Sequence, residues 1–403
     1  MYIPDEVLTV INILEKNDHN AYLVGGCVRD MLLGLKPKDF DICTSARPEK
    51  VLELFPGSIP TGIKHGTVTV IIDDLPVEIT TFRIESDYTD HRRPDKVLFS
   101  DSLTEDLKRR DFTVNAIAYH PVEGIIDPFN GIRDLKDKII RTVGNPGERF
   151  GEDALRMLRA IRLQACYGFS IDNDTFSAIR ALSKNIGAIS RERILEELNR
   201  ILLASYPEAF KNLLKTKLLN YIFPIPISET ADLTSLKNLP EELTTRWSGL
   251  LWLTGVRDAE AIRAICSGLK MSNKLKNEIL KISMLLNTRL PRNQFTIRRT
   301  LSIVGPESFA RAISIMKILK LNKNNLLEIE KASSQIISEK HCLSLSNLAV
   351  NGGDLVKSGF KPGKDLGIIL NTLFICVLQN PDLNQKDILI QFADIINQKM
   401  GKI

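Results

Sequence analysis

The hydrophobic positions follow different patterns in the two parts of the chain. Over residues 6–16 apolar side chains recur at helical spacing, and short strand-like segments follow within the first 140 residues. These segments are 21–24, 40–43, 67–72 and 77–82, and the last two form a hairpin pattern around Asp73 and Asp74. Residues 112–119 fit either a strand or a helix. The first part is therefore expected to mix α and β structure.

After about residue 145 the apolar positions recur at helical spacing only, and clear strand alternation is absent. The longest periodic stretches are 152–167, 191–204, 208–219, 274–286, 310–319 and 364–379. We therefore predict an α+β protein, in which a domain with a mixed sheet precedes an all-helical region. A chain of 403 residues is long enough for two to three domains.

Composition and charge narrow the class of protein. No apolar run is long enough to span a membrane, the first residues lack a signal-peptide layout, and the six cysteines have no zinc spacing. We expect a cytoplasmic protein with reduced cysteines. Residues 1–140 carry a net charge of −7 and the remainder carries +12. This split fits a catalytic unit joined to a polyanion-binding surface, although a chance imbalance between domains would look the same.

A glycine pair followed by charged residues is the most informative motif. Gly25 and Gly26 end the strand-like segment 21–24, and Arg29 follows three residues later. Without Cβ atoms, the backbone N–H groups of such a turn can approach a phosphate, to which an arginine adds charged hydrogen bonds. The motif predicts a phosphate-binding turn.

Asp39 and Asp41 lie one residue apart in the next strand-like segment, so both carboxylates project from one face. Like charges this close repel each other unless a cation lies between them. Mg²⁺ suits such oxygen ligands when it also binds substrate phosphates, and two ions can assist an in-line displacement. Glu78, in a neighbouring predicted strand, is our candidate for a third catalytic carboxylate. An isolated Asp-x-Asp is usually an ordinary strand end, but here it follows the glycine motif.

A second basic motif spans residues 108–116. Arg109 and Arg110 precede Asp111, and an apolar run follows, which favours an anchored pair of arginines. Arg110 is predicted to reach the triphosphate or sugar of a nucleotide, with Asp111 orienting it and Asn115 near the ribose. A solvent-facing Arg109 is the alternative.

Residues 151–162 have the composition of a helix. Asp153, Arg156, Arg159 and Arg162 recur every three residues and so lie next to one another on its surface. Cytosine and adenine each present an amino donor beside a ring-nitrogen acceptor, which an aspartate and an arginine can match, whereas uracil and guanine present the reverse. We predict that Asp153 and Arg156 read the base, with Arg159 and Arg162 beside them. A helix with solvated ion pairs is the plainer interpretation.

These ordered motifs together resemble those of class II nucleotidyltransferases, the family of bacterial and eukaryotic CCA-adding enzymes and bacterial poly(A) polymerases. The matching segments are Gly25-Gly26-Cys27-Val28-Arg29-Asp30, Asp39-Phe40-Asp41, Arg109-Arg110-Asp111-Phe112-Thr113-Val114-Asn115-Ala116 and Glu152-Asp153-Ala154-Leu155-Arg156. The resemblance extends over the whole chain, and residues 351–381 look like the family's tail.

The resemblance implies a polymerase-β-like catalytic head and an all-helical remainder. The head would span residues 1–140, a neck that recognises the base 141–205, a body 206–340 and a tail 341–403, the last two binding the acceptor arm of tRNA. It also implies that Asp39 and Asp41 bind Mg²⁺ and that Gly26, Arg29 and Arg110 contact the incoming nucleotide. The implied activity is template-independent addition of C, C and A to the tRNA 3′ end from CTP and ATP, releasing pyrophosphate.

Several alternatives stay open at this point. The polar segment 83–96 resembles the flexible loop of relatives that add the terminal A, which CC-adding relatives tend to lack, so full CCA addition is favoured and A addition alone stays open. Poly(A) synthesis is less expected, because poly(A) polymerases of the family usually carry further basic extensions. A non-catalytic RNA-binding protein would not need Asp39 and Asp41. A dinucleotide-dependent oxidoreductase is excluded because Gly25 and Gly26 do not belong to a GxGxxG motif. No histidine is followed by an aspartate, so no phosphohydrolase activity is expected. The sequence leaves a homodimer open.

Overall fold

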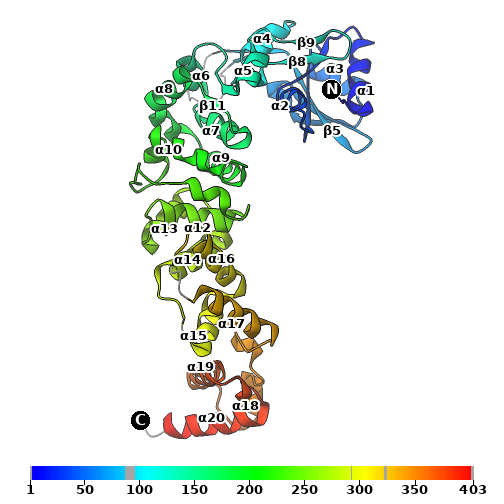
Figure 1. Cartoon of the computed structure of the whole chain (residues 1–403). Helices are drawn as coiled ribbons and strands as arrows, with labels where there is room; N and C mark the ends of the chain where they lie inside the picture. The colour runs from blue at the N-terminus through cyan, green and yellow to red at the C-terminus, as the bar shows by residue number, and fades with distance from the viewer. Residues whose placement is uncertain (1, 87–95, 292, 322–324, 401–403) are drawn as a thin grey trace. The chain divides into compact units, whose positions relative to one another are not determined.

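A computed structural model describes residues 2–86, 96–291, 293–321 and 325–400. These residues form two compact units (Figure 1). The first comprises Met1–Lys237 and Ala264–Met271, and the second comprises Asn238–Arg263 and Ser272–Ile403. The division into head, neck, body and tail is finer than these two units and stays a prediction. The segment 87–95, which holds most of the loop expected to support A addition, lies outside the described residues.

A mixed sheet forms the core of the N-terminal part. Its strands, in spatial order, are β3 (Ile59–Gly62), β4 (Thr67–Ile72), β5 (Leu75–Thr81), β2 (Phe40–Thr44), β1 (Ala21–Val24), β8 (Ala118–His120) and β9 (Gly124–Ile126). Among the described strands of this sheet, only β2 and β5 pair in parallel, and their register places Asp41 opposite Glu78. Shorter pairs are β6 (Arg83–Ser86) with β7 (Lys96–Phe99) and β10 (Ile139–Ile140) with β11 (Ser170–Ile171).

The turn between β4 and β5 explains why the hairpin could be predicted from the sequence. Asp73 and Asp74 both adopt positive φ angles, of 46° and 66°. Aspartate tolerates this left-handed conformation, which matches the twist of two antiparallel strands. Val68, Val70 and Ile79 then alternate inward and are buried. The predicted strands and the predicted mixed sheet are confirmed.

Helices pack around this sheet and then continue alone (Figure 1). Those before residue 237 are α1 (Asp5–Glu15), α2 (Gly26–Leu32), α3 (Pro48–Leu54), α4 (Leu103–Lys108), α5 (Gly131–Asp137), α6 (Pro146–Glu152), α7 (Leu155–Tyr167), α8 (Asn173–Leu182), α9 (Arg191–Leu203), α10 (Lys211–Lys215) and α11 (Leu219–Ile222). Helix α7 packs on α9, and both come from the predicted neck.

One predicted helix is interrupted. Residues 151–162 do not form a single helix, because α6 ends at Glu152 and α7 begins at Leu155. Asp153 between them is extended, with φ −135° and ψ 105°, and its carboxylate accepts the Leu155 N–H at 3.0 Å. Short aspartate side chains favour such local bonds over a helix interior. The three arginines remain on α7, whereas Asp153 lies at the bend before it.

The remaining helices are α12 (Leu243–Leu253), α13 (Ala259–Gly268), α14 (Asn273–Asn287), α15 (Gln294–Val304), α16 (Pro306–Ile318), α17 (Leu326–Ser338), α18 (Gly352–Lys357), α19 (Lys364–Gln379) and α20 (Lys386–Met400). None of the helices in the described parts of the chain combines the length and apolarity needed to cross a bilayer.

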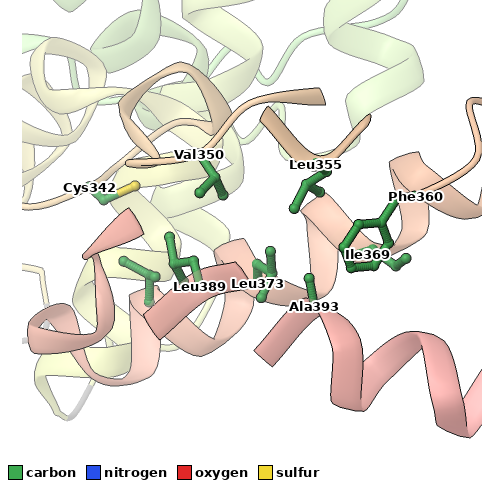
Figure 2. Close-up of a cluster of buried hydrophobic side chains, with 9 residues drawn as sticks. Cys342, Val350, Leu355, Phe360, Ile369, Leu373, Leu389 and Ala393 are labelled. Atoms are coloured by element: carbon green, nitrogen blue, oxygen red, sulfur yellow. The ribbon is translucent and has the colours of Figure 1, made fainter. Parts of the chain in front are cut away.

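The last helices share one apolar core. Figure 2 shows side chains from α18, α19 and α20 and the segments before them pointing toward one another. Leu355, Leu373 and Ala393 are fully buried there. From α15, buried Arg298 donates to the carbonyls of Leu378 at 2.6 Å and Gln379 at 3.0 Å, and so satisfies acceptors at the C-terminal end of α19.

Candidate active site

A cavity of about 640 Å³ in the first unit brings the sequence motifs together. Nine of the ten predicted site residues line it, and Glu78 is the exception. The nine are Gly26, Arg29, Asp39, Asp41, Arg110, Asp153, Arg156, Arg159 and Arg162. In all, eight arginines and four aspartates line the cavity, an excess of positive charge that suits a polyanionic ligand such as a nucleoside triphosphate.

The acidic pair lies where β2 begins. Asp39 is exposed just before the strand, and Asp41 is half-buried within it. Burial raises the pKa of Asp41 to about 6, and although Arg110 opposes this shift, the carboxylates of Asp39 and Glu78 add to it. A divalent cation would relieve the repulsion among these groups.

The residues present fit a Mg²⁺ ion of the kind that substrate phosphates complete. Within the described ranges, no three His, Cys, Asp or Glu side chains are arranged as a metal-binding group. Mg²⁺ commonly takes one or two protein carboxylates and fills its other positions with phosphate and water oxygens. Asp39 and Asp41 supply two such carboxylates, and Glu78, opposite Asp41 on β5, stays a candidate for a third.

Gly25 allows two functional side chains to approach the backbone. Its φ is +77°, and a Cβ atom there would lie 3.1 Å from Arg110 Nη1 and 3.6 Å from Asp41 Oδ2. A larger residue would therefore be strained and would also press on the arginine. Gly25 therefore permits close packing of Arg110 and Asp41 against the backbone of this turn.

A buried carboxylate that the sequence analysis missed holds Arg110. Asp106 in α4 is fully buried, and its Oδ2 accepts from Arg110 Nη2 at 3.2 Å while Oδ1 accepts from Arg109 Nε at 2.8 Å. Burial works against its ionisation, but Arg110 and Arg109 outweigh burial and lower the pKa of Asp106. Arg110 Nε is buried without a hydrogen-bond partner among the described residues.

Asp111 does not orient Arg110, contrary to the prediction. Its buried carboxylate accepts from Arg159 Nε at 2.7 Å and from Asn115 Nδ2 at 3.1 Å. Burial opposes ionisation, yet Arg159 and Asn115 hold the pKa of Asp111 well below its usual range. The motif at 109–116 therefore connects the head to α7, through Arg159.

The two predicted base-reading side chains are held by neighbours. Asp153 Oδ2 accepts from Arg193 Nη2 at 3.3 Å, and its Oδ1 accepts the Leu155 N–H. Arg156 donates to Glu152 at 2.5 Å and to the Arg109 carbonyl at 3.3 Å. Fixed side chains of opposite charge lining one cavity can present a donor and an acceptor to the edge of a base.

Three further arginines line the cavity without having been predicted to bind the nucleotide. They are Arg83 from β6, Arg109 and Arg200 from α9. Arg200 stands alone among residues of other types, and Arg83 entered the sequence analysis only as the first residue of the polar segment 83–96, so neither was predicted to bind the nucleotide. Arg162, which was predicted, is ion-paired with Glu197 of α9 at 3.2 Å.

Comparison with known proteins places the chain in a family. Residues 21–141 match the poly(A) polymerase head domain, and residues 240–393 match a tRNA nucleotidyltransferase domain 2. Residues 168–228 match a family described as "Probable RNA and SrmB- binding site of polymerase A". Together these matches cover the strands of the mixed sheet, the later part of the predicted neck and most of the helical remainder, but not residues 142–167, which include α7.

Relatives that align over nearly the whole chain support the same family assignment. The chain is 40% identical to a CCA-adding enzyme of Ligilactobacillus salivarius over 97% of both chains. It is 37% identical to one of Lactiplantibacillus plantarum, over 96% of this chain and 95% of that one. Among solved structures, the Bacillus stearothermophilus CCA-adding enzyme in complex with CTP matches over the full length of both chains, with a TM-score of 0.86 and 31% identity.

Proposed function

The chain belongs to the CCA-adding enzyme family, and from this premise we propose that it adds C, C and A in turn to the 3′ end of tRNA. CTP and ATP would donate CMP and AMP, and pyrophosphate would leave. The tRNA 3′ hydroxyl can attack the α-phosphate directly, so no covalent protein intermediate is required.

One observation carries this proposal. A single cavity is lined both by the acidic pair Asp39 and Asp41 and by the pair Asp153 and Arg156. The first pair is suited to phosphoryl transfer and the second to reading a base edge. A protein that selects its nucleotide by its own side chains and transfers it in the same cavity does not need a nucleic-acid template.

The roles of the remaining residues follow from charge and placement. Gly26, Arg29 and Arg110 would hold the triphosphate, and Arg159 and Arg162 would add positive charge beside the base. Glu78 would assist the acidic pair. Mg²⁺ bound to Asp39 and Asp41 would supply Lewis-acid stabilisation of the charge that develops on the phosphate oxygens. The helical region after the neck would bind the acceptor arm of tRNA by recognising the backbone and shape of the RNA. The reaction would take place in the cytoplasm.

Product lengths test the proposal. A tRNA transcript lacking CCA is incubated with the protein and Mg²⁺, with CTP alone, ATP alone or both, and the products are resolved on a sequencing gel. The proposal predicts two added residues with CTP and three with both. Long A tails would indicate a poly(A) polymerase, extension by ATP only of a transcript already ending in CC would indicate an A-adding enzyme, and no extension would favour a non-catalytic binder.

A further inference from the structure

A continuous series of hydrogen bonds connects two residues of α7, Tyr167 and Arg159, by way of residues of the head. Tyr167, the last residue of α7, accepts from Arg29 Nη2 at 2.5 Å, and Arg29 Nη1 donates to Asn115 Oδ1 at 2.5 Å. Asn115 Nδ2 then donates to Asp111, which accepts from Arg159 in the middle of α7. Arg29, Asn115 and Asp111 all belong to the head and are each less than a tenth exposed.

Tyr167 forms the first link by three separate contacts. Its hydroxyl donates to Asp30 Oδ1 at 2.7 Å and accepts from Arg29, whose guanidinium carbon lies 4.6 Å from the centre of the tyrosine ring. Burial raises the pKa of Tyr167 above its usual range, so the hydroxyl keeps the proton that it donates to Asp30. The neck is thereby tied to α2 through a donor, an acceptor and an aromatic face.

The contacts at Arg159 and at Tyr167 both hold the same rigid helix, α7. Residues 159 and 167 are about 12 Å apart along an α-helix at 1.5 Å per residue. Two fixed points at that separation determine both the position and the tilt of α7 against the head. Arg156 and Arg159 on α7 and Arg29 in the head line the same cavity, whereas Tyr167 is not among its lining residues.

We propose that Tyr167 is a positioning residue for nucleotide selection: its hydroxyl fixes α7 against α2, so that the base contacts and the phosphate contacts are made by one nucleotide at once. The inference rests on the proposed nucleotide transfer. Loss of the hydroxyl leaves the ring over Arg29, and Asp30 and Asn115 still hold that guanidinium. Phosphate binding is therefore retained, while the C-terminal end of α7 loses its tether.

Tyr167→Phe separates these effects. The efficiency of single-nucleotide addition, kcat/KM, is measured for CTP and for UTP on a tRNA transcript lacking CCA. We expect the value for CTP to fall about tenfold, the size expected for losing hydrogen bonds to charged partners, because CTP uses both sets of contacts. The value for UTP, which mismatches the base-reading pair already, stays within about twofold, so that the CTP-to-UTP ratio falls about tenfold.

Tyr206→Phe is the matched control. Tyr206 is 46% exposed, and its ring lies beside Gly168, the residue that follows Tyr167. The hydroxyl of Tyr206 takes no part in the hydrogen bonds described above. This variant should keep the CTP-to-UTP ratio of the parent, and the melting temperatures of both variants report whether each still folds.

Equal losses for CTP and UTP in Tyr167→Phe would show that the residue merely supports the fold or Arg29, and an unchanged kcat/KM for both nucleotides would show that α7 needs no tether. Either outcome overturns the inference while leaving nucleotide transfer intact. Failure of the parent protein to extend tRNA would instead remove the proposed function and the inference together.

Discussion

At the scale of single residues, Asp41 combines the demands of the proposed chemistry. It lies on a strand between Phe40 and Ile42, which are both buried, so its carboxylate is directed to the opposite face of the sheet, toward the cavity. Partial burial and two nearby carboxylates make its charge costly, and Arg110 offsets only part of that cost. A bound cation would complete the compensation.

Asp41→Asn should remove nucleotide transfer while leaving the fold intact. The amide keeps the shape of the side chain but lacks the negative charge that holds a divalent cation, so we expect addition to slow by about 10³-fold or more. Single-turnover addition of CMP is the measurement. Asp73→Asn is the control, because Asp73 is an exposed turn residue with positive φ, which asparagine also tolerates. Activity in Asp41→Asn near that of the control would contradict the assigned role.

Metal affinity should depend on pH through the same residue. Because the pKa of Asp41 is raised to about 6, its carboxyl is protonated below that pH and must lose a proton to bind metal. The apparent affinity for Mg²⁺ should therefore fall by about tenfold per pH unit below pH 6 and level off above about pH 7. Calorimetric titration of the protein with Mg²⁺ at a series of pH values measures this, and a flat profile between pH 5 and 7 would refute it.

Most residues of the site could be predicted from the sequence, but the side chains that pair with the arginines could not. Asp111 adjoins Arg110 in the chain, which suggested that the two interact. Neighbouring residues in extended or irregular backbone often point apart, and Arg110 instead pairs with Asp106, four residues earlier. Helical spacing of three and four residues before Arg109 and Arg110 was the available signal for Asp106.

At the scale of elements, the turn from β1 into α2 decides whether the acidic and basic groups can meet. Gly25 has φ +77° and ψ −132°, a conformation that residues with a Cβ atom strongly disfavour. The side chains of Arg110 and Asp41 lie close to its Cα, and all three residues line the same cavity. The turn is thus shaped by packing requirements from two other segments of the head.

Gly25→Ala should impair catalysis much more than Gly34→Ala. Both glycines have positive φ, so each variant carries backbone strain, but a Cβ at Gly34 meets nothing within 4 Å. At Gly25 the methyl group would lie 3.1 Å from Arg110 Nη1, so that the arginine must shift by a few tenths of an ångström, and misplacement of a group at a reacting centre can cost up to about 10²-fold in rate. Comparing kcat/KM for CTP at matched folded fractions separates strain from displacement. Equal activity in the two variants would mean that the contact at Gly25 has no catalytic consequence.

The break between α6 and α7 is a case in which helical periodicity in the sequence did not reveal the end of a helix. Asp153 and the arginines after it keep a spacing of three residues, so the pattern runs on through the bend and hides it. The local cue was the aspartate itself, which prefers to cap a helix rather than lie within one. Its carboxylate and the arginines of α7 still line the same cavity, because Asp153 lies only two residues before the first residue of α7.

At the scale of the whole molecule, the chain forms two compact units, and the whole proposed site lies in the first. Fold class was predictable because a sheet pattern and a long helical pattern occupy separate parts of the sequence. The boundary between the units was not, because a short segment of α13 and the residues after it, Ala264–Met271, group with the first unit. Such long-range packing leaves no periodic signal.

Leu373→Ala should affect tRNA use and spare nucleotide binding. Leu373 is fully buried in the core of the last helices, so its truncation should destabilise that region by about 2–5 kcal/mol. Ile368→Ala on the same helix is the control, since Ile368 is 50% exposed. We expect a raised KM for tRNA in Leu373→Ala alone, with CTP affinity unchanged in both. A parallel loss of CTP affinity would show that the two units do not act separately.

The central claim, that one cavity selects and transfers the nucleotide without a template, is tested most directly by sequencing products. A tRNA transcript lacking CCA is incubated with Mg²⁺ and equal concentrations of all four nucleoside triphosphates, and the added 3′ residues are read. The account predicts that chains gain C, C and A. U and G are excluded because the edges of uracil and guanine leave Asp153 and Arg156 without matching partners. Incorporation of U or G at rates comparable with C, or tails that continue in A, would contradict it.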